Sequence, residues 1–271
     1  MTEEAVTFGA HGTLVGVVSE PVLREYGRRA VLMANIGMHH RVGPFRLYVE
    51  LARALAASGL YVLRFDLAGM GDSAARPDRQ SPSESATSDI EAAMTFMTSM
   101  YGIAEFLLVG LCSGVDAIHV VAARDARTRG AVFIDGYSYP TSGFRLRHAV
   151  HRPLQPVRWV RFARRITRGQ SRRGSDAAAT VFAREEPSHR QFVTDVLAMT
   201  SRAARLLFIY TGGASARFNS PRQLVETLGG ESLPAGVECE LMRDADHVFS
   251  RTDQRRRLCA RITRWCHAAS E

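Results

Sequence analysis

The chain has 271 residues, of which 46% are hydrophobic and 23% charged, and its net charge is +8. This composition is typical of one large globular domain and excludes a disordered chain, and no hydrophobic run reaches the roughly 20 residues of a membrane-spanning helix. The polar start of the chain is unlike a secretory signal. The chain has 4 cysteines, too few for a disulfide framework in this length, so we expect a reduced, cytoplasmic protein.

Seven short runs of apolar and β-branched residues predict β-strands. Most of them lack a strict alternation of polar and apolar residues, which is typical of strands covered on both faces of a sheet. The runs occupy residues 13–19, 30–37, 60–67, 106–111, 130–136, 205–212 and 237–242.

Helical patterns lie between several of these runs. Residues 45–58 and residues 253–269 each place large apolar side chains on one stripe. Residues 88–100 begin with a serine that predicts a helix cap, followed by acidic residues in the first turn. Strand and helix in repeated alternation predict an α/β fold, with a mostly parallel twisted sheet and helices on both faces.

A long interval between two of the strands interrupts this alternation, because one crossover helix needs far fewer residues. We therefore predict a helical cap at residues 137–204, inserted into a core made of residues 1–136 and 205–271. Ten arginines and no acidic residue lie between Tyr137 and Ser175. The positive charge of the chain therefore belongs to the predicted cap.

The sequence Gly-Leu-Cys-Ser-Gly places Cys112 just past a predicted strand end. Gly110 and Gly114 are small enough to let a strand and a helix approach closely at a sharp turn. Such a turn directs the Cys112 side chain out of the sheet, where a helix N-terminus favours the thiolate. The backbone N–H of Ser113 then points to where an oxyanion would form. A small buried cysteine is the structural alternative.

Four segments, in this order, resemble the α/β-hydrolase superfamily. They are residues 34–73, the Gly-x-Cys-x-Gly turn, residues 132–141 and residues 244–250. The first is similar to serine-aminopeptidase-like members, and the chain as a whole most resembles hydrolases encoded beside bacterial exosortase and exopolysaccharide systems. The resemblance implies the α/β-hydrolase fold with an inserted cap, and it places Cys112 where most members carry serine.

The resemblance also implies roles for individual positions. Cys112 would be the nucleophile, His247 the general base, and the backbone N–H groups of Met38 and Ser113 the oxyanion hole. Outside the resemblance, a histidine like His247 would be interpreted as an ordinary surface-loop residue.

The catalytic acid is where the chain departs from the family pattern. Most relatives carry it in the loop after the seventh strand, and residues 210–220 contain no acidic residue. Asp135, at the end of the sixth strand, occupies a known variant location and is the predicted acid. Its alternative role is a turn cap. Asp246 adjoins His247, and neighbouring side chains rarely face each other as an acid–base pair requires.

Several further residues have open interpretations. His39 and His40 flank the oxyanion loop, where they either complete loop hydrogen bonds or bind substrate. The cap arginines, including Arg164 and Arg165, form a solvated surface or dock an acidic acyl carrier protein or CoA, whose phosphates suit arginine. An anionic membrane surface is a further alternative. We expect no nucleic acid partner, because no nucleic-acid reading motif accompanies the arginines. We expect no metal or cofactor, because no Cys/His spacing suits zinc and the chain has no lysine for a P-loop.

A cysteine nucleophile forms an acyl thioester, which stays activated for a second acceptor. The chain resembles Dieckmann cyclases in having the cysteine, an early aspartate and a late histidine, and dienelactone-hydrolase-like enzymes also use cysteine. We therefore predict a thioesterase or acyltransferase that acts on a carrier-bound or CoA thioester, or a reactive ester, by hydrolysis, transfer or cyclisation. The alternatives are a Dieckmann-type carbon–carbon cyclase, a carboxylester hydrolase of exopolysaccharide metabolism, and a non-catalytic protein that binds through its basic cap.

Overall fold

The computed structural model describes residues 1–23, 27–35, 37, 39–77, 80–151 and 186–268. Its strands are β1 (Thr2–Phe8), β2 (Leu14–Glu20), β3 (Arg29–Ala34), β4 (Tyr61–Phe65), β5 (Glu105–Leu111), β6 (Thr128–Ile134), β7 (Arg205–Thr211) and β8 (Val237–Met242). They form one 8-stranded sheet in the order β1-β2-β4-β3-β5-β6-β7-β8. β1 with β2 and β2 with β4 pair antiparallel, and the remaining pairs are parallel. The predicted fold class is confirmed.

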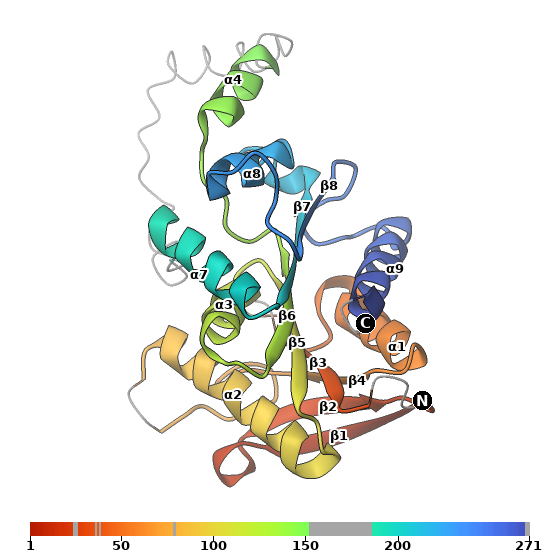
Figure 1. Cartoon of the computed structure of the whole chain (residues 1–271). Helices are drawn as coiled ribbons and strands as arrows, with labels where there is room; N and C mark the ends of the chain where they lie inside the picture. The colour runs from red at the N-terminus through yellow and green to blue at the C-terminus, as the bar shows by residue number, and fades with distance from the viewer. Residues whose placement is uncertain (24–26, 36, 38, 78–79, 152–185, 269–271) are drawn as a thin grey trace, which may run out of the picture.

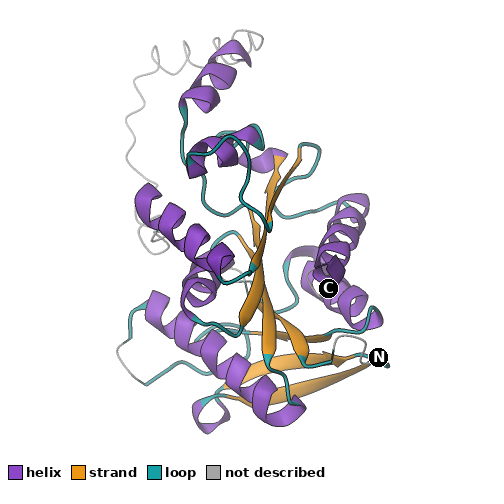
Figure 2. Ribbon diagram, in the orientation of Figure 1, coloured by secondary structure: helices purple, strands orange, loops and turns teal. Residues whose placement is uncertain are grey.

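Helices cover both faces of this sheet. The described residues form α1 (Leu47–Ala57), α2 (Pro82–Tyr101), α3 (Gly114–Arg124), α4 (Ser142–His151), α7 (His189–Ser201), α8 (Arg222–Leu228) and α9 (Thr252–Ala268). Short 3₁₀ turns lie at Ala10–Gly12, Pro44–Arg46 and Gly212–Ala214. Figures 1 and 2 show α2, α3 and α7 on one side of the twisted sheet and α1 and α9 on the other.

Alternate residues of the central strands enter two separate hydrophobic clusters. Leu32 and Leu63 belong to the cluster that includes α2, α3 and α7, whereas Val31 and Val62 belong to the cluster that includes α1 and α9. All four side chains are fully buried or nearly so. Each such burial contributes about 1.5–3 kcal/mol. Burial on both faces explains why the strand sequences show so little polar–apolar alternation.

The start of α2 differs from the prediction. The helix begins at Pro82 rather than near Ser88, and Ser81 is its cap. The Ser81 hydroxyl accepts from the Glu84 backbone N–H, while the Glu84 carboxylate accepts from the Ser81 N–H, which makes a capping box. The prediction of a cap at Ser88 is wrong because the first two turns are polar and lack the apolar period on which it depended.

The predicted cap is only partly described. Residues 152–185 lie outside the described ranges, and with them eight of the ten arginines, including Arg164 and Arg165. Within the described part, Arg147 forms a 3.2 Å ion pair with Glu226. α7, although assigned to the cap region, buries Phe192 and Val196 in the same hydrophobic cluster as α3.

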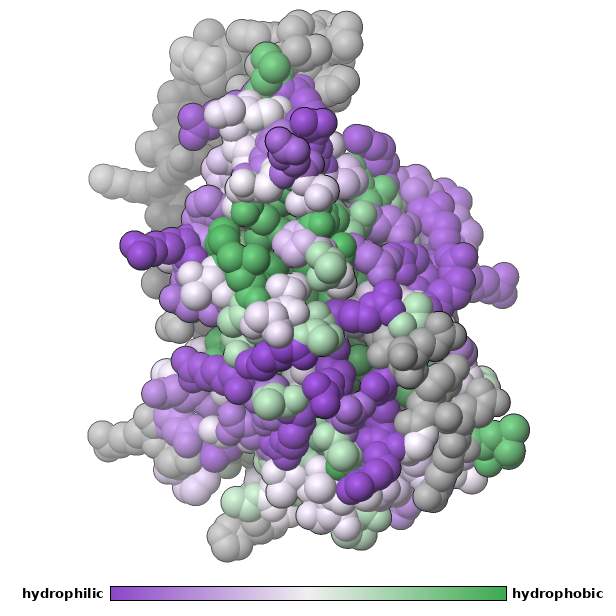
Figure 3. Space-filling model, in the orientation of Figure 1, coloured by the Kyte–Doolittle hydropathy of each residue, from purple (hydrophilic) through white to green (hydrophobic). Residues whose placement is uncertain are grey.

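The surface visible in Figure 3 is largely hydrophilic, with a patch of hydrophobic side chains just below α8. None of the helices in the described part of the chain combines the length and the apolar character that a membrane-spanning segment requires.

Candidate active site

Cys112 lies on a sharp turn between β5 and α3. Its backbone is left-handed, with φ 55°, and its N–H donates to the carbonyl of Ile134 at the end of β6 (2.9 Å). A Cβ on Gly110 would lie 2.7 Å from the carbonyl oxygen of Gly114, so any larger residue would force the strand and helix apart. The turn leaves the Cys112 side chain partly exposed at the carboxyl end of the sheet, where open α/β sheets bind ligands.

Asp135 follows β6 and is completely buried. Its backbone is also left-handed, with φ 48°, and its N–H donates to the carbonyl of Ile209 in β7 (2.8 Å). One carboxylate oxygen, Oδ1, accepts from the Thr211 backbone N–H (2.7 Å). The other, Oδ2, accepts from the Thr211 hydroxyl (2.6 Å) and lies 2.7 Å from Nδ1 of His247.

The imidazole of His247 lies between Asp135 and Cys112. Hydrogen bonds with Asp135 and then with Cys112 raise the pKa of His247 from 6.5 to about 10, although partial burial opposes the shift. The His247 side chain is 40% exposed, so its charged form is also hydrated. The structure thus brings together the three side chains that the sequence indicated as a Cys–His–Asp triad, with Asp135 placed directly after β6.

Asp246 serves its own loop. Its carboxylate accepts from the backbone N–H groups of Val248 and Ser250 (both 3.1 Å) and from the Ser250 hydroxyl (2.6 Å). These bonds shape the turn that leads into α9 and leave the imidazole of His247 to Asp135.

The region of the predicted oxyanion hole is described in part. Ser113 is the N-cap residue of α3, and a Cβ on Gly37 would lie 3.5 Å from its hydroxyl oxygen, so the loop after β3 runs beside this helix end. Asn35, which is buried, fixes the loop: its amide donates to the Gly37 carbonyl (3.1 Å) and its oxygen accepts from the Leu67 N–H (2.9 Å). Met38 lies outside the described residues.

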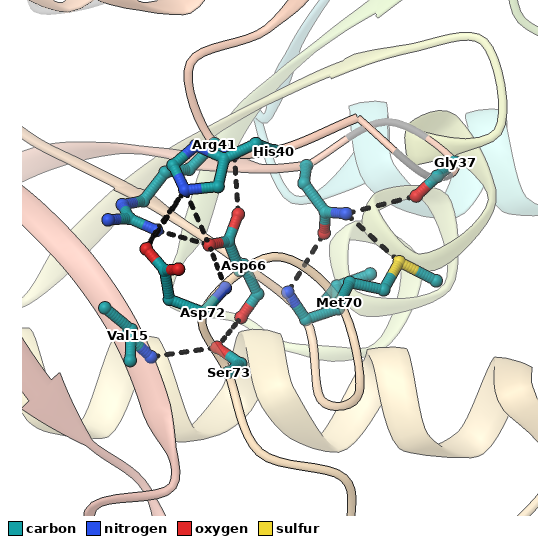
Figure 4. A network of polar contacts seen from close by, with 10 residues as sticks. Val15, Gly37, His40, Arg41, Asp66, Met70, Asp72 and Ser73 are labelled. Atoms are coloured by element: carbon teal, nitrogen blue, oxygen red, sulfur yellow. Dashed lines mark hydrogen bonds and ion pairs between the residues drawn. The ribbon is translucent and has the colours of Figure 1, made fainter.

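The two loop histidines differ. His39 is exposed, whereas Nε2 of His40 lies 3.1 Å from the Asp72 carboxylate and 2.7 Å from Nη1 of Arg41. Arg41 also donates its backbone N–H to buried Asp66 (2.6 Å), and its guanidinium contacts both Asp66 and Asp72 (Figure 4). Hydrogen bonds from His40 and Arg41 hold the pKa of Asp72 below its usual value. His40 thus belongs to the network that ties this loop to the turn after β4.

The same network contains the one group of side chains, within the described part of the chain, whose spacing suits a metal ion: His40, Asp66 and Asp72. Nη1 of Arg41 contacts a ligand atom of each of the three. The guanidinium therefore already supplies positive charge where a cation would bind, and the arrangement fits an ion-pair network better than a metal centre.

The sequence also relates the chain to known proteins. The profile of the Alpha/beta hydrolase family matches residues 32–262. The chain belongs to this family. Its Cys112, Asp135 and His247 all lie within the matched range. No curated protein matches the sequence of this α/β hydrolase.

Solved structures resemble the α/β hydrolase over 97% or more of its length. The esterase domain of a Rhodothermus marinus protein is 19% identical, with a TM-score of 0.61 and 100% of both chains covered. The α/β hydrolase GrgF from Penicillium sp. sh18 is 14% identical, with a TM-score of 0.64 and 100% and 99% covered. An α/β serine hydrolase homologue from Coxiella burnetii is 15% identical, with a TM-score of 0.56 and 97% of each chain covered. At these identities the likeness shows the shared fold.

Two residues of the site were missed by reasoning from sequence, namely Thr211 and Asn35. Thr211 ends β7 and donates two hydrogen bonds to Asp135, and Asn35 follows β3 and shapes the loop beside Ser113. Their shared signal is a buried polar residue at the carboxyl end of a parallel strand, where ligands bind.

Proposed function

We propose that this α/β hydrolase is an acyl-transfer enzyme in which Cys112 is the nucleophile, His247 the general base and Asp135 the acid. The observation that carries the proposal is the placement of the His247 imidazole, hydrogen-bonded to Asp135 on one side and to Cys112 on the other. A thiol at a strand-to-helix turn, next to an imidazole that a buried carboxylate orients, has the parts that nucleophilic catalysis needs.

The proposed reaction has two halves. The proton of Cys112 resides on His247 in the resting ion pair, the thiolate attacks the carbonyl carbon of the acyl donor, and the leaving group departs with that proton from the imidazolium. The acyl group, now a thioester of Cys112, passes to an acceptor that His247 deprotonates. Asp135 stabilises the imidazolium in both halves, and the Ser113 N–H at the start of α3 stabilises the oxyanion.

The chemistry of sulfur favours a thioester donor, held on an acyl carrier protein or CoA. Exchange of one thioester for another is nearly isoenergetic, so the acyl-enzyme keeps its activation for transfer or ring closure as well as for hydrolysis. Arginine-rich residues 137–175 would suit the phosphates and acidic surface of such a donor.

Mass spectrometry of the intact protein with an acyl N-acetylcysteamine thioester tests the proposal. We expect one acyl adduct on the wild type and on the control Cys259→Ala, and none on Cys112→Ala. The background is low because the chain has no lysine amines to acylate, and because burial raises the pKa of Cys239, Cys259 and Cys266 to about 12. An adduct that persists in Cys112→Ala, or none with a range of acyl groups, contradicts the proposal.

A carboxylester hydrolase is the second candidate, because two of the similar solved structures are called an esterase domain and a serine hydrolase homologue. The two candidates separate kinetically. A carboxylester hydrolase should turn over short nitrophenyl esters in a steady state. An enzyme that passes its acyl group to an acceptor other than water should release one equivalent of nitrophenol and then stop until that acceptor is added.

A further inference from the structure

We propose that Thr211 is a positioning residue that holds the Asp135 carboxylate in place and aimed at His247. This inference rests on the proposed function, because it assigns Thr211 a part in the same Cys112–His247–Asp135 arrangement. It concerns the residue that ends β7, the strand after which the family usually places the acid.

The contacts of Asp135 carry the inference. The carboxylate is 0% exposed, and two of the three hydrogen-bonding partners that it has among the described residues are groups of Thr211: the backbone N–H at 2.7 Å and the hydroxyl at 2.6 Å. Thr211 is itself completely buried. The hydroxyl shares Oδ2 with the imidazole, so it acts on the oxygen that faces His247.

The loop that follows Thr211 packs closely against the loop that carries His247. A Cβ on Gly213 would lie 2.8 Å from the backbone nitrogen of His247, and a Cβ on Gly212 would overlap the carbonyl oxygen of Arg243. These two glycines let the histidine loop pack directly on the end of β7. An acidic residue at either position would displace that loop. β7 can therefore support the acid from Thr211, but these positions cannot supply it.

Burial makes the hydroxyl matter for the chemistry. A buried carboxylate needs hydrogen-bond donors that replace its hydration, and these donors also fix its orientation. Without the Thr211 hydroxyl, Oδ2 of Asp135 would lose one of its two contacts, and the carboxylate would be held less firmly against the His247 imidazolium that it stabilises. Less imidazolium means less Cys112 thiolate at neutral pH, and the nucleophile would weaken although no group that touches substrate had changed.

Alkylation of Cys112 by iodoacetamide across a pH series tests this role, with Thr211→Val as the isosteric loss of the hydroxyl. We expect the rate at pH 7 to fall about tenfold, the effect of one charge-assisted hydrogen bond, with the lower limb of the profile moved to higher pH. Thr211→Ser should keep the wild-type rate within about twofold because it keeps the donor. Thr211→Ala, which also lacks the hydroxyl, is measured in parallel in case valine does not fold.

Thr128→Val is the matched control. Thr128 begins β6, the strand that Asp135 follows, and its buried hydroxyl has no hydrogen-bond partner among the described residues. Its removal should leave the profile unchanged. A wild-type profile in Thr211→Val and Thr211→Ala, or an equal shift in Thr128→Val, overturns the inference. Alkylation needs no acyl substrate, so a wild type without an acyl adduct counts against the proposed function while leaving this test intact.

Discussion

Cys112 and Asp135 share an unusual backbone conformation. Both are non-glycine residues with positive φ, at 55° and 48°, and a left-handed residue costs about 1–2 kcal/mol relative to a right-handed one. Each is held by a hydrogen bond from its own N–H to the neighbouring strand, at Ile134 and Ile209 respectively. The sheet thus enforces a conformation that turns each side chain toward the carboxyl edge.

The pKa of His247 sets a pH dependence for Cys112. Because that pKa is about 10, the imidazole remains protonated at neutral pH and favours a thiolate beside it. An isolated thiol with a pKa of about 8.5 is only about 3% ionised at pH 7. Cys112 should therefore keep most of its high-pH alkylation rate at pH 7. Measured rates that rise tenfold per pH unit from pH 6 to pH 8 would contradict the ion pair.

The variant Asp135→Asn tests the role of the carboxylate charge without disturbing the fold. The amide nearly matches the carboxylate in shape, but it carries no charge to stabilise the imidazolium. We expect acyl transfer to fall on the order of 10³-fold, with the circular dichroism spectrum preserved. Near-normal turnover in this variant would show that another group serves as the acid.

At the scale of elements, the sequence predicts best what depends on apolar periodicity. The strands β2 to β8 occur within a few residues of their predicted runs, because each buries apolar side chains. β1 was not predicted, since most of its residues are exposed and it pairs only with β2 at the sheet edge. Its strand conformation comes from pairing with Leu14–Glu20, which a local pattern does not reveal.

The candidate site divides in the same way. Cys112 and His247 could be predicted from sequence motifs. Asp135 could be predicted because the loop after β7 contains no acidic residue. Thr211 could not, because its contact with Asp135 depends on the register of β6 against β7, where Ile134 lies opposite Ile209. Two residues that are distant in sequence become neighbours only through that pairing.

The capping box of α2 gives a prediction about stability. Ser81→Ala removes the hydroxyl that accepts from the Glu84 N–H. We expect a loss of about 1 kcal/mol in the free energy of unfolding, measured by urea denaturation. Ser85→Ala, one turn into the same helix, is the control, because alanine favours a helix interior. Equal losses of stability in the two variants would mean that the Ser81 cap does not stabilise the helix.

For the molecule as a whole, the uneven charge predicts how a carrier-bound donor should behave. Ten arginines lie in residues 137–175, and salt screens exposed charges beyond about 8 Å at physiological ionic strength. The KM for an acyl carrier protein thioester should rise with salt while kcat holds. The small N-acetylcysteamine thioester should show no such rise. An identical salt response of the two donors would argue against docking on these arginines.

The hydrogen bonds that hold Cys112 and Asp135 extend the sheet ladder past the formal ends of β5 and β6. Cys112 and Asp135, the proposed nucleophile and acid, are therefore held by hydrogen bonds across three adjacent strands, which lie about 4.8 Å apart from one strand to the next. The sheet itself therefore sets the spacing of Cys112 and Asp135. Replacing the loops around the site should change which substrates bind without changing the relative position of these two residues. Conversely, a one-residue slip of β6 would turn Asp135 to the opposite face of the sheet, away from His247.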